Sequence, residues 1–559
     1  MFTNKKFLRI FAVLMVALLI LPACGPGATP VTEIIEVEKE VEVEVEVTRI
    51  VEGEVVTEMI VVTATPEPAE EEVVEEGGGE LIFALSADEI RLDPLATTWN
   101  TDILIHNNIY LQLYRVNEDG SGLEPFAAES YEVNDEATVW TFTLRDDIKF
   151  SDGTPITAED VVYSIERGFS ETSLWGWIYE EAGLESGKTT ALDERTVQFE
   201  LLATFVPFVS YISGYWASIF PKAALEEMGD EAFFQNPITS GDWTVEEFVQ
   251  ADHLTIVPSP YAIGEAKLDR ITIPLIPDDN TRMLQLSAGQ IDVGYIVPAS
   301  QIDSINSLPD LVVNVYPFAF TEVLYDNQAK APFDDENFRR ALNYAIDREA
   351  LIDAILFGHA TMPGSFLPKG VIYWDDSIEG YPFDLEKAEE YLALSNYPDG
   401  YDFELWTTTT SATGIEIATA LQGMWNQLPG VNVEIVQYEN AVLREKRDNG
   451  EHWVFVGGYS SDVADPGQIT AWFLTGYVND AFRHGNVDEV KPMLATANAE
   501  LDPVTREVMF HEIQQWSQDH SFCFNLYYTN SNWGMKKSVK DLWVNPLQIM
   551  DLNDVWIDE

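Results

Sequence analysis

The chain has 559 residues, of which 95 are acidic and 31 are basic, so its formal net charge at pH 7 is −64. Because nucleic acids and anionic lipid surfaces are polyanions, this excess of negative charge excludes both as surface partners. The roughly 480 residues that follow residue 80 exceed what one hydrophobic core organises, so two or three lobes are expected.

The first residues predict an export signal that ends at a cysteine. Lys5, Lys6 and Arg9 accompany an apolar run that closes with the sequence LPACG around Cys24. The run is too short to span a membrane comfortably and fits a secretory signal peptide over residues 1–23. LPAC resembles the lipobox of bacterial lipoproteins, which implies cleavage before Cys24 and lipidation of its thiol. An ordinary signal in which Cys24 is incidental is the alternative.

Residues 24–79 are predicted to form an acidic, low-complexity stalk. Between residues 31 and 80, seventeen glutamates accompany only Lys39 and Arg49, and valine alternates with glutamate. The alternation has the period of a β-strand, but a ribbon with carboxylates along one face repels itself and has no second apolar layer. We therefore expect a charged, extended stalk. A self-associating β-stalk that would oligomerise the protein is the alternative.

The segment from residue 124 to residue 168 gives the clearest secondary-structure pattern. Residues 138–144 alternate around Trp140 and Phe142 and predict a half-buried strand, with a turn before it at residues 134–136. Thr157 and Asp160 have the spacing of a capping box, and an apolar helical face follows. By themselves these features predict a mixed α/β fold and no particular chemistry.

The sequence offers no pattern for catalysis or for metal binding. It contains no nucleophile elbow, no Walker loop and no dinucleotide-binding glycine motif. Cys523 reads as a small buried hydrophobe, and no later stretch is apolar enough for a spanning helix. We therefore predict neither an enzyme nor a cofactor or metal site. The histidines lack paired-ligand spacing: His106, His253, His359, His452, His484, His511 and His520.

Several segments together resemble the family 5 extracellular solute-binding proteins of ABC importers, which include oligopeptide, dipeptide and nickel binders. The resemblance is carried by EPFAAESYEVNDEATVWTFTLRDDIKFSDGTPITAEDVVYSIERG (124–168), DDNTRMLQLSAGQIDVGYIVP (278–298), APFDDENFRRALNYAIDREALIDAILFGHA (331–360) and GGYSSDVADPGQI (457–469). The chain departs from the family pattern at Asp147 and Ser151, and at 239–243, where TSGDW is a weak match to the family's GTGPY. In the third segment, Asp347 is placed to cap a helix that ends near Gly358.

The resemblance implies an α/β fold of the periplasmic-binding-protein type, type II, cluster C. Two mixed α/β lobes are joined by a hinge, and an extra domain is inserted in the first lobe. The expected boundaries are 80–115, 223–315 and 520–559 for lobe I, 116–222 for the inserted domain and 316–519 for lobe II.

The same resemblance implies a substrate-binding protein of an ABC importer that captures a peptide or similar small solute between its lobes. Its expected partners are that ligand, the permease and ATPase subunits, and the membrane through the lipid anchor. We expect a monomer outside the cytoplasm, anchored to the bacterial cell membrane in the periplasm or on the cell surface. The alternatives are an oligosaccharide or metal-chelate binder on the same fold, a stalked surface hydrolase, and a sensory or adhesive binding protein.

In peptide-binding relatives an aspartate of the last segment holds the ligand's α-ammonium, and Asp462 occupies the matching position. Asp465 precedes Pro466 and is expected to hold the loop in shape. No arginine can be assigned to a ligand carboxylate. Aromatic side chains provide flat walls for ligands, and the remaining candidates for the site are Tyr459, Trp406, Trp99 and Asn100.

Overall fold

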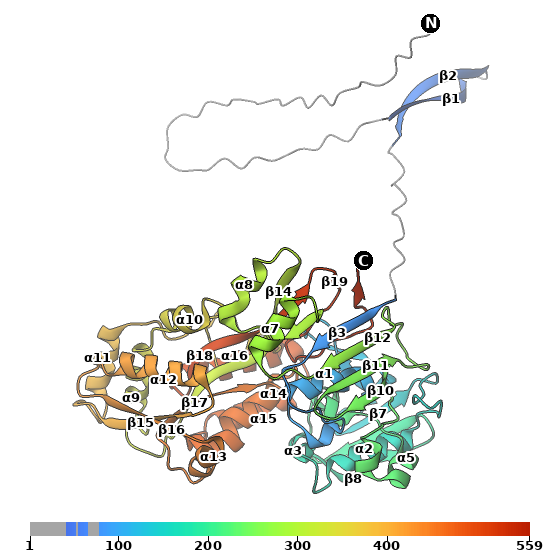
Figure 1. Cartoon of the computed structure of the whole chain (residues 1–559). Helices are drawn as coiled ribbons and strands as arrows, with labels where there is room; N and C mark the ends of the chain where they lie inside the picture. The colour runs from blue at the N-terminus through green and yellow to red at the C-terminus, as the bar shows by residue number, and fades with distance from the viewer. Residues whose placement is uncertain (1–40, 52–53, 65–77, 559) are drawn as a thin grey trace, which may run out of the picture. The chain divides into compact units, whose positions relative to one another are not determined.

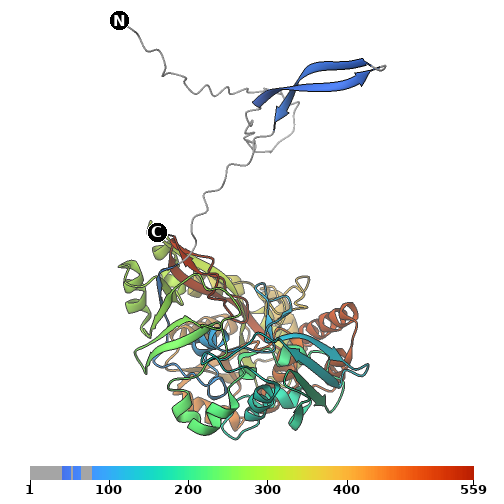
Figure 2. The same cartoon turned by 90° about the vertical axis from the view of Figure 1, so that its right-hand side faces the viewer.

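The computed structural model describes residues 41–51, 54–64 and 78–558, and the chain forms two compact units, Met1–Glu75 and Glu76–Glu559. The predicted signal peptide and Cys24 lie outside the described residues. In the first unit, β1 (Val41–Val51) and β2 (Glu54–Ala64) form an antiparallel pair with Val41 opposite Ala64 (Figures 1 and 2). This hairpin differs from the extended stalk that we expected. The alternating sequence forms strands because their pairing within the chain satisfies the backbone hydrogen bonds.

A mixed sheet of ten strands runs through the second unit. Its strand order is β10-β11-β12-β3-β13-β18-β14-β17-β15-β16. In that order the strands are Trp243–Val249, His253–Pro258, Arg270–Pro274, Glu80–Ala84, Val293–Tyr295, Phe524–Lys536, Leu311–Asp326, Val454–Ser460, Asp402–Thr408 and Asn432–Tyr438.

Strands β14 and β18 are the long central pair of this sheet. They pair antiparallel from Leu311 opposite Lys536 to Leu324 opposite Phe524, and the register shifts between Pro317 and Thr321. The last part of β18, Trp533 to Met535, pairs with β13, and the second part of β14, Phe320 to Asp326, pairs with β17. The two ends of the sheet are therefore connected through strands whose pairing is irregular at two points, the second being between Glu322 and Val323.

A separate four-stranded antiparallel sheet occupies one end of the unit (Figure 1). Its order is β6-β7-β9-β8, with β7 at Val139–Leu144, as the alternating pattern predicted. Helix α2 (Ala158–Gly168) begins with the predicted capping box, in which the Asp160 carboxylate accepts from the Thr157 backbone N–H at 2.9 Å. The remaining elements near this sheet are β4 (Tyr114–Val116), β5 (Leu123–Pro125), β6 (Ala128–Val133), β8 (Leu184–Ala191), β9 (Thr196–Leu201), α3 (Gly176–Glu181), α4 (Phe208–Tyr211), α5 (Lys222–Met228) and α6 (Asp230–Phe233).

Most of the later helices gather around β15, β16 and β17 at the other end (Figure 1). The Asp347 side chain caps α10 (Arg348–Leu356) by accepting from the Ala350 N–H at 3.0 Å, as predicted, and the left-handed Phe357 ends the helix. The other helices with strands β19 and β20 are α1 (Asn100–Ile109), α7 (Asp279–Ser287), α8 (Ile302–Asn306), α9 (Glu336–Tyr344), α11 (Leu385–Leu394), α12 (Ala412–Trp425), α13 (Asn440–Asp448), α14 (Pro466–Thr470), α15 (Val490–Ala499), α16 (Pro503–Asp519), β19 (Val539–Lys540) and β20 (Trp556–Ile557).

The buried apolar side chains of residues 78–558 form several groups rather than one continuous core. One group lies almost entirely between Leu95 and Ile219 and belongs to the four-stranded sheet. Others surround β3 and β12, or cover the part of the large sheet around β15 and β17. Phe524 and Leu526 pack with this last part, so the predicted segment 520–559 contacts both ends of the sheet. The lobe boundaries themselves stay a prediction.

Candidate functional site

Asp465 fixes the shape of the loop that follows β17. Its side chain accepts from the backbone N–H of Gly467 at 2.8 Å and caps α14. Arg506 of α16 donates two hydrogen bonds to the same carboxylate at 2.5 and 2.8 Å, and both side chains are only 4% exposed. Such charge-assisted, bidentate contacts are strong and directional. The role of Asp465 is therefore to hold the loop, as the sequence indicated.

Asp462, in the same loop, has no such cation beside it. Its half-buried carboxylate receives a long hydrogen bond from Gln468 Nε2, at 3.4 Å. Within residues 78–558, no lysine, arginine or histidine forms an ion pair with this carboxylate, and burial raises its pKa to about 7. A carboxylate held in this state is stabilised in its charged form by a cation that a ligand brings.

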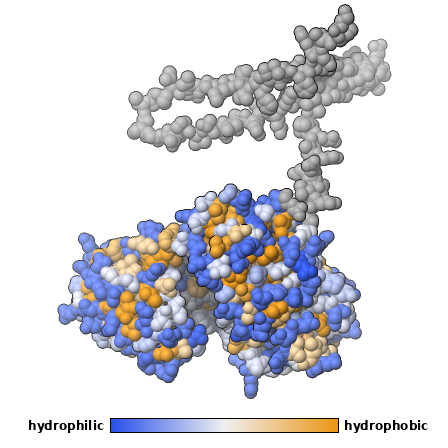
Figure 3. All heavy atoms as spheres, in the orientation of Figure 1, coloured by the Kyte–Doolittle hydropathy of each residue, from blue (hydrophilic) through white to orange (hydrophobic). Residues whose placement is uncertain are grey.

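Asp462 lies in a pocket formed by segments that are far apart in the sequence. In the space-filling view the surface is hollowed between the two ends of the unit (Figure 3), and the empty space at the pocket, open solvent included, is about 370 Å³. The structure thus brings Asp462 together with Asn100, the first residue of α1. The other residues that line this pocket are Ile103, Asn107, Gly214, Tyr215, Phe318, Ser460, Ser461, Leu547 and Ile549; we call it the Asp462 pocket.

Two further groups shape the electrostatics around Asp462. The Tyr215 side chain is 4% exposed, and its hydroxyl has no hydrogen-bond partner in the described part of the chain. Burial and the Asp462 charge both raise the pKa of this hydroxyl. Glu181 accepts a hydrogen bond from Tyr211 at 2.6 Å, and its pKa rises to about 7 through burial and through the nearby Asp462 and Asp465. The surroundings of Asp462 are therefore rich in negative charge.

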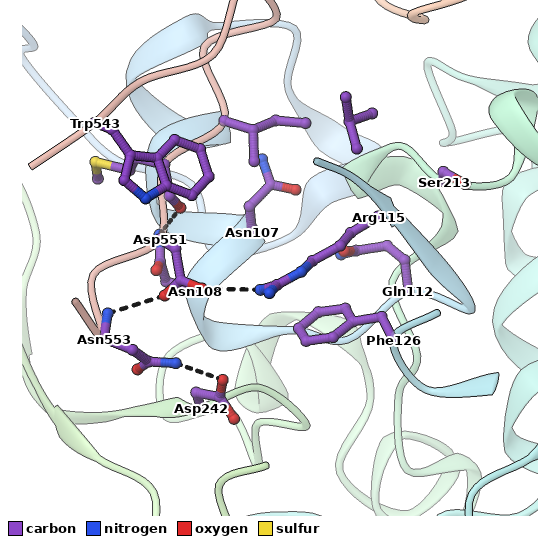
Figure 4. Close-up of a pocket in the computed structure, with 13 residues that line it drawn as sticks. Asn107, Asn108, Gln112, Arg115, Phe126, Ser213, Asp242, Trp543, Asp551 and Asn553 are labelled. Carbon is purple, nitrogen blue, oxygen red and sulfur yellow. Dashed lines mark hydrogen bonds and ion pairs between the residues drawn. The ribbon is translucent and has the colours of Figure 1, made fainter. Parts of the chain in front are cut away.

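A second pocket continues from the first, because Asn107 and Ile549 line both (Figure 4). The empty space here, open solvent included, is about 440 Å³, and Arg115 is among the residues that line it, so we call it the Arg115 pocket. The guanidinium lies over the Phe126 ring at 4.6 Å and donates to Glu124 at 2.7 Å and to Asp551 at 2.9 Å. The indole of Trp543 and several amide side chains complete the wall.

Strand β17 presents an open edge beside the Asp462 pocket. It pairs with β14 along its whole length but with β15 only at Val454 and Phe455. The other edge of residues 457–460 consequently pairs with no strand among the described residues. Ser460 belongs both to this edge and to the pocket lining. An extended peptide could add to such an edge through main-chain hydrogen bonds.

The structure does not place the other aromatic candidates at the pocket. Tyr459 is 3% exposed, and its hydroxyl donates to the Phe366 carbonyl. Trp406 is 2% exposed, and its Nε1 donates to Glu404 at 2.7 Å. Both rings pack in the core around β15 and β17, so their contact with a ligand stays a prediction that their burial does not favour. Trp99 is 47% exposed at the start of α1 but does not line either pocket.

Sequence reasoning missed Tyr215, Asn107 and Arg115, which come from segments without a recognisable motif. One signal was present: Asn100, Ile103 and Asn107 are spaced i, i+3 and i+7 and therefore share a helix face. Nothing comparable connects Tyr215 or Arg115 with Asp462. Their proximity depends on how the inserted segment packs against α1.

Neither a metal site nor a membrane span is found in the described residues. No three or more histidine, cysteine, aspartate and glutamate side chains gather there closely enough to hold a metal ion. The helices of the same residues are all too short or too polar to cross a bilayer.

Comparison with known proteins gives the family. Residues 122–481 match the model described as bacterial extracellular solute-binding proteins, family 5 middle. The chain is 30% identical over 492 residues to the probable D,D-dipeptide-binding periplasmic protein DdpA of Escherichia coli K12. This alignment covers 85% of this chain and 93% of that protein. It is 28% identical over 390 residues to heme-binding protein A of Haemophilus influenzae, covering 64% of this chain and 70% of that protein.

Solved structures confirm the predicted fold class. The periplasmic binding protein DppA from Helicobacter pylori, in complex with the peptide STSA, aligns with a TM-score of 0.74 at 24% identity, over 87% of this chain and 99% of that one. HbpA2 from Haemophilus parasuis aligns with a TM-score of 0.77 at 23% identity, over 86% of this chain and all of the other. The chain therefore belongs to the bacterial extracellular solute-binding proteins of family 5.

Proposed function

We propose that this protein captures a peptide or a similar small solute in its Asp462 pocket and delivers it to the permease of an ABC importer. The observation that carries the proposal is the half-buried carboxylate of Asp462, which faces a pocket without a cation of its own. The relatives with peptide or dipeptide in their names support the ligand class. Capture requires no bond to be made or broken in the solute, in keeping with a family of binding proteins.

Asp462 is proposed to hold the α-ammonium of the peptide. A hydrogen bond to a charged group contributes roughly 1.5 to 3 kcal/mol, which is a useful part of the roughly 8 kcal/mol in a micromolar complex. The peptide main chain would add to the free edge of β17 near Ser460. The pocket is formed by residues of α1 on one side and of β17 and its following loop on the other, so a bound solute would contact both and favour a closed state.

The register shift in β14 and β18 provides a place for that closure. Residues Pro317 and Thr321 bracket the first of the two places where pairing with β18 is irregular. Interrupted pairing leaves fewer hydrogen bonds to resist bending, and hinges of this kind absorb the motion of packed domains. We further propose that Cys24 carries the lipid anchor and that the mature protein acts as a monomer at the outer side of the cell membrane.

Calorimetric titration of the whole mature chain, purified in detergent, tests the ammonium assignment. The probes are Ala-Ala-Ala and its N-acetyl derivative. Asp462→Asn should weaken binding of the free peptide by about 10- to 100-fold, because the lost interaction has the size given above, and should change binding of the acetylated peptide little. Glu389→Gln, an exposed carboxylate on α11, is the matched control. Equal losses for both peptides would remove the ammonium assignment, and binding of oligosaccharides alone would reject peptide capture.

A further inference from the structure

The two connected pockets carry more negative than positive charge. Their linings contain the three carboxylates of Asp242, Asp462 and Asp551, and one cation, Arg115. Arg115 is already engaged by Asp551 and by Glu124, at 2.9 and 2.7 Å. A ligand carboxylate that approached Arg115 would therefore meet an excess of negative charge, whereas a second cation would be attracted.

The carboxylates differ in how free they are to bind. Asp242 is 6% exposed and is occupied by the backbone N–H groups of Ile263 and Gly264 and by Asn553. Asp551 is half-buried, and within residues 78–558 its oxygens accept only from Arg115 and from the Asn553 backbone N–H at 2.9 Å. A carboxylate can accept about four hydrogen bonds, so Asp551 keeps room for a ligand donor.

An independent feature points to a ligand rich in N–H donors. Tyr215 lines the Asp462 pocket, and its buried hydroxyl lacks a hydrogen-bond partner in the part of the chain that the structure describes. An unpaired buried hydroxyl costs free energy, and an ammonium that reaches Asp462 could donate to this oxygen as well. Besides the acidic lining, the Tyr215 hydroxyl is thus a second acceptor that could bind the ligand's ammonium.

Helix α1 lines both pockets and gives a length scale for a peptide that would occupy them. Asn100 and Asn107 line the Asp462 pocket, and Asn107 and Asn108 line the Arg115 pocket. At about 1.5 Å per residue, the seven residues from Asn100 to Asn107 extend about 10 Å along α1. One or two extended residues, at about 3.4 Å each, and a long basic side chain together cover that distance.

We propose that the connected pockets select peptides with a net positive charge, with the amino terminus at Asp462 and a basic side chain of the second or third residue at Asp551. The inference rests on the proposed function and names the substrate class of the same site. Trp543 and Phe126 provide aromatic surfaces along the aliphatic part of that side chain (Figure 4). The preference would arise from charge at short range, where the pocket walls exclude much of the water.

Titration with three peptides, Ala-Lys-Ala, Ala-Ala-Ala and Ala-Glu-Ala, tests the preference on the whole mature chain. The measured quantity is the ratio of the Kd for Ala-Ala-Ala to the Kd for Ala-Lys-Ala. We expect a ratio of about 10, which corresponds to about 1.4 kcal/mol, and the weakest binding for Ala-Glu-Ala. Equal affinities for the three peptides would overturn the inference while leaving peptide capture intact. Absence of binding by all three would instead reject the proposed function and the inference with it.

Two variants that change the charge of the pocket in opposite directions distinguish an electrostatic effect from damage to the pocket. Asp551→Asn should lower the ratio by about 5- to 10-fold, whereas Arg115→Gln should raise it, because removal of the cation makes the lining more negative. General damage to the pocket would change the Kd ratio of both variants in the same direction, and that result would overturn the inference. Glu389→Gln makes the same charge change as Asp551→Asn on the exposed surface of α11 and should leave the ratio unchanged. An equal drop in this control would show that overall charge, not the pocket, sets the preference.

Discussion

Replacing Asp462 with asparagine should stabilise the ligand-free protein above pH 7, although the same change weakens peptide binding. Burial raises the pKa of Asp462 from 3.8 to about 7, whereas in the unfolded chain the carboxyl titrates near its ordinary value of about 3.9. Between these two values the native protein holds a proton that the unfolded chain has released. Stability therefore falls as the pH rises through this range, and the full loss is reached above about pH 7. Asparagine does not titrate and avoids this loss.

The size of the effect follows from the same shift. About three pKa units correspond to about 4 kcal/mol, and water at the half-buried carboxylate reduces this to about 2 kcal/mol. The entropy of unfolding is about 2.1 cal/mol/K per residue. For the Glu76–Glu559 unit the total entropy of unfolding is therefore about 1 kcal/mol/K. The expected rise in Tm is therefore about 2 °C at pH 8, and it should shrink to about a third of that at pH 5.

Thermal unfolding followed by fluorescence, from pH 5 to pH 9 and without ligand, measures this difference. Asp465→Asn is the matched control, because it makes the same chemical change in the same loop but breaks the buried pair with Arg506. It should lower the free energy of unfolding by about 3 kcal/mol. A Tm for Asp462→Asn that equals or lies below that of the wild type at pH 8, or a difference that does not vary with pH, would refute the reasoning.

Two further substitutions probe residues whose roles the structure defines. Gly241→Ala should destabilise the protein by about 1 to 3 kcal/mol in urea unfolding, because its Cβ would lie 2.6 Å from the Ile109 carbonyl carbon and 2.7 Å from the Tyr110 nitrogen; an unchanged midpoint would show that α1 can move away. Tyr459→Phe should cost about 1 kcal/mol through loss of the hydrogen bond to Phe366 and leave the Kd for Ala-Ala-Ala unchanged. A weakened Kd at unchanged stability would return Tyr459 to the binding site.

Local elements were the most predictable part of the fold. The strand Val139–Leu144, the capping box of α2 and the cap of α10 by Asp347 each depend on residues within a few positions of one another. The family resemblance added the fold class, which the structural comparisons confirm. The β1–β2 hairpin was misjudged, because the sequence showed the charge repulsion but not the backbone pairing that competes with it.

The candidate site was predictable only in part. Asp462 and Asn100 do line one pocket, but Trp406 and Tyr459 are buried in the core. In a chain with 15 tryptophans and 22 tyrosines, an aromatic side chain near a binding loop points to the core or to the cleft according to strand register and twist. The sequence alone does not give that direction, since neighbouring positions on a strand face opposite sides.

The sequence by itself determined the export signal and acidic segment as predictions, the family, the local caps and turns, and the importance of the loop around Asp462. Only the tertiary structure decided that Tyr215, Asn107 and Arg115 lie near this loop, and that Asp465 but not Asp462 has an arginine partner. The physical reason is that these contacts join segments far apart in the sequence, by 41 residues for Asp465 and Arg506 and by hundreds of residues for the others. Their distances follow from the packing of whole lobes, which no local pattern of residues records.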